Sequence, residues 1–311
     1  MNKKSFEEFW GVYQQEIKLL SEDVELKRKY ANIYIYINII LVFLTFSAFY
    51  LLRAYVNISI MVAMALMLVI LKVITLREHK SQEIKEEFKN IIYTRITRFL
   101  FPNIYYSHDK NYELLRNMKN SMIFNEGIYE LGSYFFGTIN GVRADFGEIT
   151  LYKEKRRGDK RGIIFKGLII SADFPKNILG FVRIYPRDLH SVFGFNDMFD
   201  SGEQITLDNP EFEKEFVVYG VDVVDIMYIL SHSMMERLLD IKKTYPHDMF
   251  ISIATNKIYI FVNYGSSIEP KLGKDLTSKA YLENSFNALN LLFVQMEYIV
   301  KTLKLDVSIW K

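Results

Sequence analysis

The stretch FYLLRAYVNISIM, residues 49–61, decides how the first third of the chain is organised. It places Arg53 and Asn57 inside a long run of residues that are otherwise almost wholly apolar. A charge in such a run is expected either within one long buried element or at a turn between two elements. The segments on its two sides distinguish these alternatives.

Both segments have the length and composition of a membrane span. Residues 33–52 carry no charge, and residues 58–76 carry only Lys72, whose long side chain can reach the head groups. As a helix, each segment reaches roughly 30 Å, the thickness of the hydrocarbon core of a bilayer. The alternative is a hairpin buried in a soluble core, but soluble helices rarely are apolar on every face for about twenty residues. We therefore predict a two-helix transmembrane hairpin over residues 33–76, with a turn at Arg53–Asn57.

Basic residues lie at the outer ends of this hairpin. They are Lys18, Lys27, Arg28 and Lys29 before the first span, and Lys72, Arg77, Lys80, Lys85 and Lys89 at or after the end of the second. The turn offers Arg53 alone. Because Lys and Arg near the ends of spans are retained in the cytoplasm, both termini are predicted to be cytoplasmic. The first apolar run is too long for the core of a signal peptide, so the spans are expected to stay in the mature protein.

The composition excludes several kinds of site and partner. The 39 Lys and Arg residues nearly balance the 37 Asp and Glu residues, for a formal net charge of +2, so no nucleic-acid partner is predicted. The chain has no cysteine, which excludes disulfides, thiolate metal sites and cysteine catalysis. Any binding to a strongly charged partner must therefore be local.

Two segments show the heptad spacing of a helix with one apolar face. Ser5 and Glu8 have the spacing of a capping box and open the first segment. Its apolar positions are Phe6, Trp10, Tyr13, Ile17, Leu20 and Val24, and those of the C-terminal segment are Leu282, Phe286, Leu289, Phe293, Met296, Val300 and Leu303. Each apolar face needs a partner, either within the subunit or in a second copy of the chain. The sequence leaves both alternatives open.

Strands are expected where short β-branched and aromatic runs are bounded by Gly, Pro or charge. These runs are SYFFGTING (133–141), GEITLYKEK (147–155), GIIFKGLIISADF (162–174), GFVRIYP (180–186), KEFVVYG (214–220) and the hairpin FISIATNKIYIFVN (250–263), with its turn at Asn256 and Lys257. FKGLIISA is apolar on both faces, as a central strand should be. Asp222 is expected to cap a helix that continues to about Lys243.

The predicted fold class is a membrane-anchored α+β protein. A cytoplasmic domain of about seven mostly antiparallel strands, with long flanking helices, follows the two-helix transmembrane hairpin. The expected parts are an N-terminal amphipathic cytoplasmic helix (1–32), the hairpin (33–76), connecting helices (77–127) and the α+β domain with a long C-terminal helix (128–311).

Three stretches carry a resemblance to a known family. They are FKGLIISADF (165–174), NPEFEKEFVVYGVDVVDIMYILSHSMMERLLDI (209–241) and ISIATNKIYIFV (251–262), with Glu269 and Pro270 after them. Over most of residues 130–270 the chain resembles the domain of unknown function 3137 family of bacterial proteins. Members similar to this one carry a membrane hairpin ahead of the domain, and the family has no established activity. The resemblance thus implies a bacterial source and supplies no catalytic residues. Together with the charged flanks of the spans, it predicts a location in the bacterial cytoplasmic (inner) membrane.

The motifs of known catalytic sites are absent from the sequence. It has no G-x-G-x-x-G after a strand, no P-loop and no H-E-x-x-H. Ser231 and His232 are adjacent on a predicted helix, so they point about 100° apart and cannot pair as nucleophile and base. We therefore predict no catalytic, cofactor-binding or metal-ligating residue, and no cofactor.

One local charge anomaly remains, KEKRRGDKRG at residues 153–162. A solvated loop that is kept charged to prevent edge pairing would have this composition. The functional alternative is contact with anionic lipid or a partner, since each basic residue near a membrane surface contributes on the order of 1 kcal/mol. The candidate contact residues are Lys155, Arg156, Arg157, Lys160 and Arg161.

The pattern favours a membrane protein whose cytoplasmic domain is a non-enzymatic interaction, scaffold or sensing module. Its expected partners are membrane lipid through two spans, and a protein or a second copy of the chain through the heptad-patterned helices. The alternative is a membrane-tethered enzyme that acts on lipid or peptide. Its acid and base would be scattered polar residues such as Asp173, Asp225, His232 and Glu236.

Overall fold

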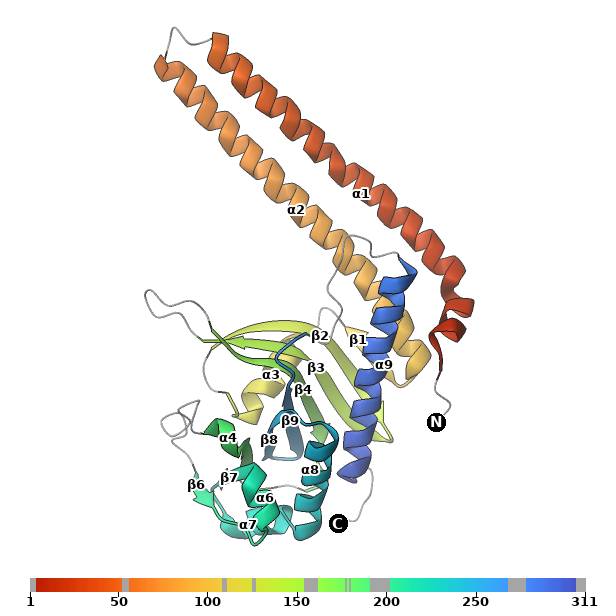
Figure 1. Ribbon diagram of the computed structural model, residues 1–311, viewed down its shortest axis with the longest axis vertical. Helices are drawn as coiled ribbons and strands as arrows, with labels where there is room; N and C mark the ends of the chain where they lie inside the picture. Colours follow the sequence, from red (N-terminus) through yellow and green to blue (C-terminus); the bar gives the residue numbers. More distant parts are fainter. Residues whose placement is uncertain are drawn as a thin grey trace. The chain divides into compact units, whose positions relative to one another are not determined.

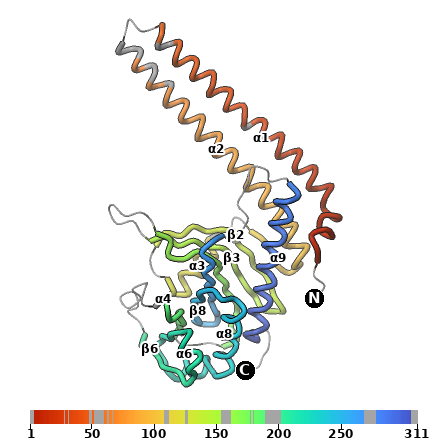
Figure 2. Tube along the Cα trace, viewed as in Figure 1, coloured from red at the N-terminus to blue at the C-terminus, as the bar shows by residue number. Residues whose placement is uncertain are grey.

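The computed structural model describes residues 4–51, 56–107, 111–124, 127–153, 162–176, 178, 180–190, 202–267 and 278–305. The chain divides into two compact units. They are Met1–Tyr93 with Lys271–Asn284, and Thr94–Pro270 with Ser285–Lys311. Figure 1 shows the elements of each unit and Figure 2 the path of the chain.

The first unit consists mainly of two long helices, α1 (Phe6–Leu51) and α2 (Val56–Leu100), the second of which continues into the other unit. The predicted capping box forms, because the Ser5 N–H donates to Glu8 Oε2 over 3.0 Å and the Glu8 N–H donates to Ser5 Oγ over 3.2 Å. α1 then runs for 46 residues without interruption. The two helices lie side by side in Figure 1.

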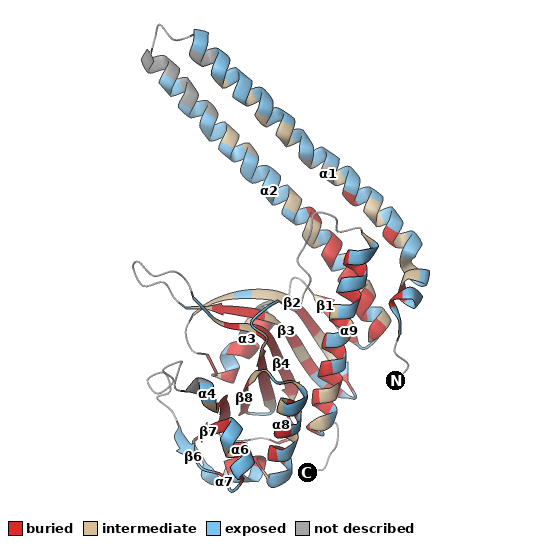
Figure 3. Ribbon diagram, viewed as in Figure 1, coloured by how far each residue is buried: buried red, intermediate tan, exposed pale blue. Residues whose placement is uncertain are grey.

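Apolar side chains are exposed on both helices where the spans are predicted (Figure 3). Phe43 and Leu51 of α1 are 73% and 77% exposed, and Met61 and Leu68 of α2 are 69% and 68% exposed. One segment, Phe6–Ser47, is long and apolar enough to cross a membrane by length and composition, and none of its apolar window is buried. Among the described residues no other helix meets both criteria, so the two-helix transmembrane hairpin remains a prediction.

The second unit is built on one sheet of nine strands, all of whose pairings are antiparallel. The strands are β1 (Ile104–Ser107), β2 (Ile128–Ile139), β3 (Val142–Tyr152), β4 (Ile163–Asp173), β5 (Phe181–Pro186), β6 (Glu203–Ile205), β7 (Phe216–Gly220), β8 (Asp248–Ala254) and β9 (Lys257–Asn263). Their order is β1-β2-β3-β4-β9-β8-β5-β7-β6. The α+β class is confirmed.

The strand count and one turn differ from the prediction. The sequence analysis missed β1 and β6, two edge strands of four and three residues that are too short to show a periodic pattern. The β8–β9 turn lies at Thr255 and Asn256, one residue earlier than predicted, because Ala254 pairs with Lys257. The central position of β4 agrees with the prediction, and Leu168 to Ala172 are all buried.

Six shorter helices follow α2 among the described residues. They are α3 (Asn111–Ser121), α4 (Arg187–His190), α6 (Pro210–Glu215), α7 (Val223–Ile229), α8 (His232–Thr244) and α9 (Lys279–Thr302). Asp222 caps α7 as predicted and accepts hydrogen bonds from the N–H groups of Val224 and Asp225. The single helix predicted up to Lys243 is instead two, because the backbone leaves the helical conformation at Leu230 (φ −84°, ψ 51°) and Ser231 (φ −55°, ψ 158°) before α8 begins.

The two faces of the sheet are covered by different helices. On one face Phe293 of α9 meets the rings of Phe135 and Phe146 edge-on, at 5.4 and 5.8 Å between centroids. On the other face lies a hydrophobic core that α3 covers and that contains Phe124 and Phe261. At the centre of the sheet, the backbones of β4 and β9 approach each other closely at Gly167. A Cβ at Gly167 would lie 2.0 Å from a carbonyl oxygen of β9, so only glycine fits there.

The heptad positions are largely buried within this one chain. All seven C-terminal positions, from Leu282 to Leu303, are buried, and so are Phe6, Ile17 and Val24 of α1. Trp10, Tyr13 and Leu20 are half-buried. These positions are therefore covered within the single chain, and a second copy of the chain as a partner stays a prediction.

Candidate functional site

The basic loop lies largely outside the described residues. Lys155, Arg156, Arg157, Lys160 and Arg161 all belong to the undescribed residues 154–161. Its two ends are described, and the Lys153 N–H donates to the Gly162 carbonyl over 2.8 Å. The loop therefore joins two neighbouring antiparallel strands, β3 and β4.

The acid and base residues considered for an enzyme do not form one enclosed site among the described residues. Asp173 at the end of β4 pairs with Arg143 at 2.8 Å. The His232 Nε2 atom lies 3.2 Å from Glu236 Oε1, but these side chains are 72% and 62% exposed on α8. Asp225 lies in the first turn of α7. Among the described residues no group of three or more His, Cys, Asp or Glu side chains is placed to hold a metal ion.

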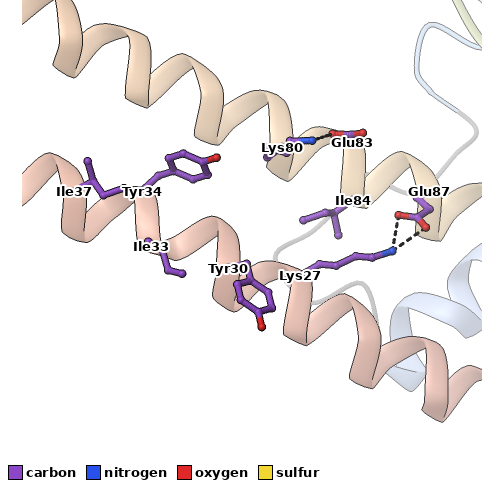
Figure 4. Close-up of a pocket in the computed structure, with 9 residues that line it drawn as sticks. All are labelled: Lys27, Tyr30, Ile33, Tyr34, Ile37, Lys80, Glu83, Ile84 and Glu87. Carbon is purple, nitrogen blue, oxygen red and sulfur yellow. Dashed lines mark hydrogen bonds and ion pairs between the residues drawn. The ribbon is translucent and has the colours of Figure 1, made fainter.

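A cavity of about 540 Å³ lies between α1 and α2 in the first unit (Figure 4). This volume is within the range of small-molecule sites, roughly 300–1,000 Å³. Its lining residues are Lys27, Tyr30, Ile33, Tyr34 and Ile37 from α1, and Lys80, Glu83, Ile84 and Glu87 from α2. The cavity thus combines two ammonium groups, two carboxylates, two phenols and three isoleucines.

Two ion pairs define the polar part of the cavity. Lys27 Nζ lies 2.8 Å from both Oε atoms of Glu87 and 2.9 Å from Asp23, which ties α1 to α2. Lys80 Nζ lies 2.8 Å from Glu83 one turn further along the same helix. The pKa of Lys27 is raised, first by the hydrogen bond to Glu87 and then by that to Asp23, so this ammonium stays charged.

The apolar part of the cavity lies toward the predicted spans. Ile33 and Ile37 belong to the predicted first span, whereas Lys27 precedes it by about two turns. From Lys27 to Ile37 the lining extends about 15 Å along the helix at 1.5 Å per residue. The cavity is therefore amphipathic along its length. An amphipathic ligand with a charged head and an apolar body matches this arrangement.

Sequence reasoning missed this cavity because its two walls are distant in sequence. Lys27 and Glu87 are 60 positions apart, and neither belongs to a local motif. The basic residues were noted only as flanks that orient the spans. A complementary signal was present in the acidic residues Glu83 and Glu87, which lie among those flanking lysines at helical spacing.

A second polar feature runs across one face of the sheet. Directly opposed residues of neighbouring strands point to the same face. Such pairs connect Asp145, Ser171, Tyr259, Ser252, Arg183 and Tyr219 in one row across β3, β4, β9, β8, β5 and β7. The row lies on the face covered by α3, because Tyr259 belongs to the core cluster that contains Leu114 and Met118 of that helix.

Around Ser171 this row forms a largely buried polar cluster. Lys257 Nζ lies 3.4 Å from Ser171 Oγ and 3.6 Å from Asp145, and Asn117 of α3 donates to the same carboxylate over 3.3 Å. However, Ser171 is only 1% exposed, so a substrate cannot reach its hydroxyl. Burial also lowers the pKa of Arg183 in the same row. We interpret the row as polar groups that attach α3 to the sheet.

Comparison with known proteins gives one family and one distant structure. No curated protein matches the chain. The crystal structure of the mycobacterial trehalose monomycolate transport factor A, TtfA, is similar at 10% sequence identity and a TM-score of 0.29. That similarity covers 57% of this chain and 76% of the other, and at this TM-score it supports no argument about fold or function.

The family match agrees with the resemblance seen in the sequence, but it covers different residues. The matched residues are 163–305, so they begin at β4 and extend through α9, beyond residues 130–270. They include the six strands from β4 to β9 in chain order, with the helices between them. These residues match the family described as "Protein of unknown function (DUF3137)", which supports membership of that family.

Proposed function

We propose that this chain is an integral protein of a bacterial cytoplasmic membrane, anchored by α1 and α2, with both termini in the cytoplasm. The observation that supports the anchor is the exposure of large apolar side chains on both helices, such as Phe43, Phe46 and Leu68. In water this surface would be strongly unfavourable, whereas the hydrocarbon core of a bilayer solvates it. Basic residues at the outer ends of both helices support the orientation.

Topology reporters test the anchor and its orientation. A cytoplasm-specific reporter fused after Lys311 should be active, and a periplasm-specific reporter inserted in the turn at Arg53–Asn57 should be active as well. Extraction of membranes with alkaline carbonate should leave the protein in the membrane pellet. A C-terminal fusion active only in the periplasm would contradict the proposal.

We further propose that the α+β domain is a non-enzymatic module that binds a partner or senses the state of the membrane. Three findings support this role over catalysis within the described residues. The candidate acids and bases are scattered, His232 and Glu236 are solvent-exposed, and Ser171 is buried. Crosslinking in native membranes, followed by identification of the captured proteins, tests for a partner. Turnover of a lipid or peptide by the purified chain would contradict the role.

The basic loop is proposed to contact the cytoplasmic leaflet. It joins β3 and β4 and holds five of the basic residues of the segment 153–162. In proteoliposomes of the full chain, acetylation of Lys155 and Lys160 should be slower in anionic than in neutral lipid, and salt should remove the difference. Equal acetylation rates in both lipids would leave the loop as a solvated turn.

A further inference from the structure

The cavity between α1 and α2 has a feature that a simple anchor does not need. Tightly packed helices leave little space between them, whereas here an open groove of about 540 Å³ lies between α1 and α2. Its residues lie at the boundary between the charged flanks and the exposed apolar segments. Ile33 and Ile37 are 48% and 38% exposed and begin the apolar surface of α1. The cavity is thus placed where a lipid head meets its chains.

The charges of the cavity select among lipid heads. Lys27 and Lys80 are matched by Glu83 and Glu87, so the lining has no net charge. A head with only negative charge would meet two carboxylates, and a cation alone would meet two ammonium groups. A head that carries both a phosphate and an ammonium group can bind both signs. Lys80 and Glu83 present the two charges on neighbouring positions of one helix turn, 2.8 Å apart.

The lining residues also indicate whether the bound head carries a primary ammonium or a trimethylammonium group. Carboxylates accept hydrogen bonds, which a primary ammonium donates and a trimethylammonium group cannot. Recognition of a trimethylammonium group uses a cage of aromatic faces. In Figure 4 the Tyr34 ring lies between the two helices, whereas Tyr30 points away from α2, and Tyr30 is 64% exposed. One ring between the helices does not form a cage.

We propose that the cavity between α1 and α2 binds a zwitterionic phospholipid with a primary-ammonium head from the cytoplasmic leaflet. Lys80, with the Tyr34 phenol beside it, receives the phosphate, and Glu83 and Glu87 receive the ammonium group. Ile37 and Ile84 contact the upper part of the acyl chains. The bound lipid bridges the two helices at the point where they leave the membrane. This inference rests on the proposed membrane anchor.

Native mass spectrometry of the full-length chain, purified in detergent, tests the proposal. The protein is mixed with phosphatidylethanolamine, phosphatidylglycerol and phosphatidylcholine that share the same acyl chains. The wild type is expected to retain phosphatidylethanolamine about tenfold more than either other lipid. The double variant Lys80→Gln with Glu83→Gln removes both charges and keeps both side chains polar, and it should lose this preference.

The matched control is Lys85→Gln with Glu86→Gln, on the same helix but not in the cavity lining, and it should retain the wild-type preference. Melting temperatures of the three proteins show whether each is folded. Equal retention of the three lipids by the wild type, or an unchanged preference in the Lys80 and Glu83 variant, would overturn the proposal. If carbonate also extracted the protein from membranes, the anchor itself would be wrong. Carbonate resistance without lipid preference would overturn the lipid site alone.

Discussion

Phe124 follows α3 and packs in the hydrophobic core of the second unit. Its ring is 5% exposed and lies 5.4 Å from Phe165, 5.3 Å from Phe250 and 5.4 Å from Phe261, measured between centroids. These three partners come from β4, β8 and β9 at the centre of the sheet. Replacing Phe124 by alanine should therefore destabilise the whole sheet and not only α3.

The expected loss follows from burial and ring contacts. Truncation of a buried Phe to Ala costs about 3–5 kcal/mol, because apolar burial is lost and a cavity remains. Each aromatic pair adds roughly 0.5–1.5 kcal/mol beyond area burial, and Phe124 makes three such pairs, which places the loss near the upper part of that range. With a urea slope of about 2–3 kcal/mol/M, the unfolding midpoint should fall by about 1–2 M.

Pulse proteolysis of the full-length chain in detergent, across a urea series, measures this midpoint. The matched control is Tyr105→Ala in the edge strand β1, since Tyr105 is 54% exposed and stacks on a single ring at 5.7 Å. It should shift the midpoint by less than about 0.5 M. A shift for Phe124→Ala no larger than that of the control would refute the assignment of Phe124 to the core.

Two further predictions concern the α1 helix and the response to alkaline pH. Ile17→Asp should lower the melting temperature of the detergent-solubilised chain, because Ile17 is 2% exposed and an unpaired buried carboxylate costs several kcal/mol. Leu19→Asp, at a 68% exposed position, should leave the melting temperature unchanged. Equal effects of the two substitutions would show that this face of α1 is not buried. Burial raises the pKa of Tyr264 to about 12, whereas a tyrosine in the unfolded chain ionises near 10. The contribution of neutral Tyr264 to the free energy of unfolding is therefore complete below about pH 10 and is lost as the pH rises through about 12. Tyr264→Phe should remove roughly 2 kcal/mol of that alkaline loss in a urea titration across this pH range, and an unchanged loss in the variant would contradict the reasoning.

Several features of the fold are local, and the sequence alone predicts them. The Ser5–Glu8 capping box and the Asp222 cap depend on residues a few positions apart, so their spacing is sufficient. The central position of β4 follows from its apolar residues on both faces. The α+β class rests on local pattern too, because periodicity of two and of 3.6 separates strands from helices. The family rests instead on the resemblance of three stretches of sequence, which the family match supports.

Other features depend on residues that are distant in sequence. β1 and β6 are too short to show a period and exist because longer neighbours, β2 and β7, offer free edges for pairing. The break between α7 and α8 also escaped the pattern, since the apolar positions keep their helical spacing across Ser231.

The candidate site was decided by tertiary structure. In the sequence, Lys27 and Lys80 are only positive flanks of two spans, and Glu87 is one of many acidic residues. The cavity arises because α1 and α2 lie antiparallel, which brings positions 60 residues apart within 2.8 Å. Likewise, Asp145, Ser171 and Arg183 are isolated polar residues within apolar strands until strand register aligns them in one row. Local patterns specify elements, whereas the relative position of two elements depends on contacts that no single segment encodes.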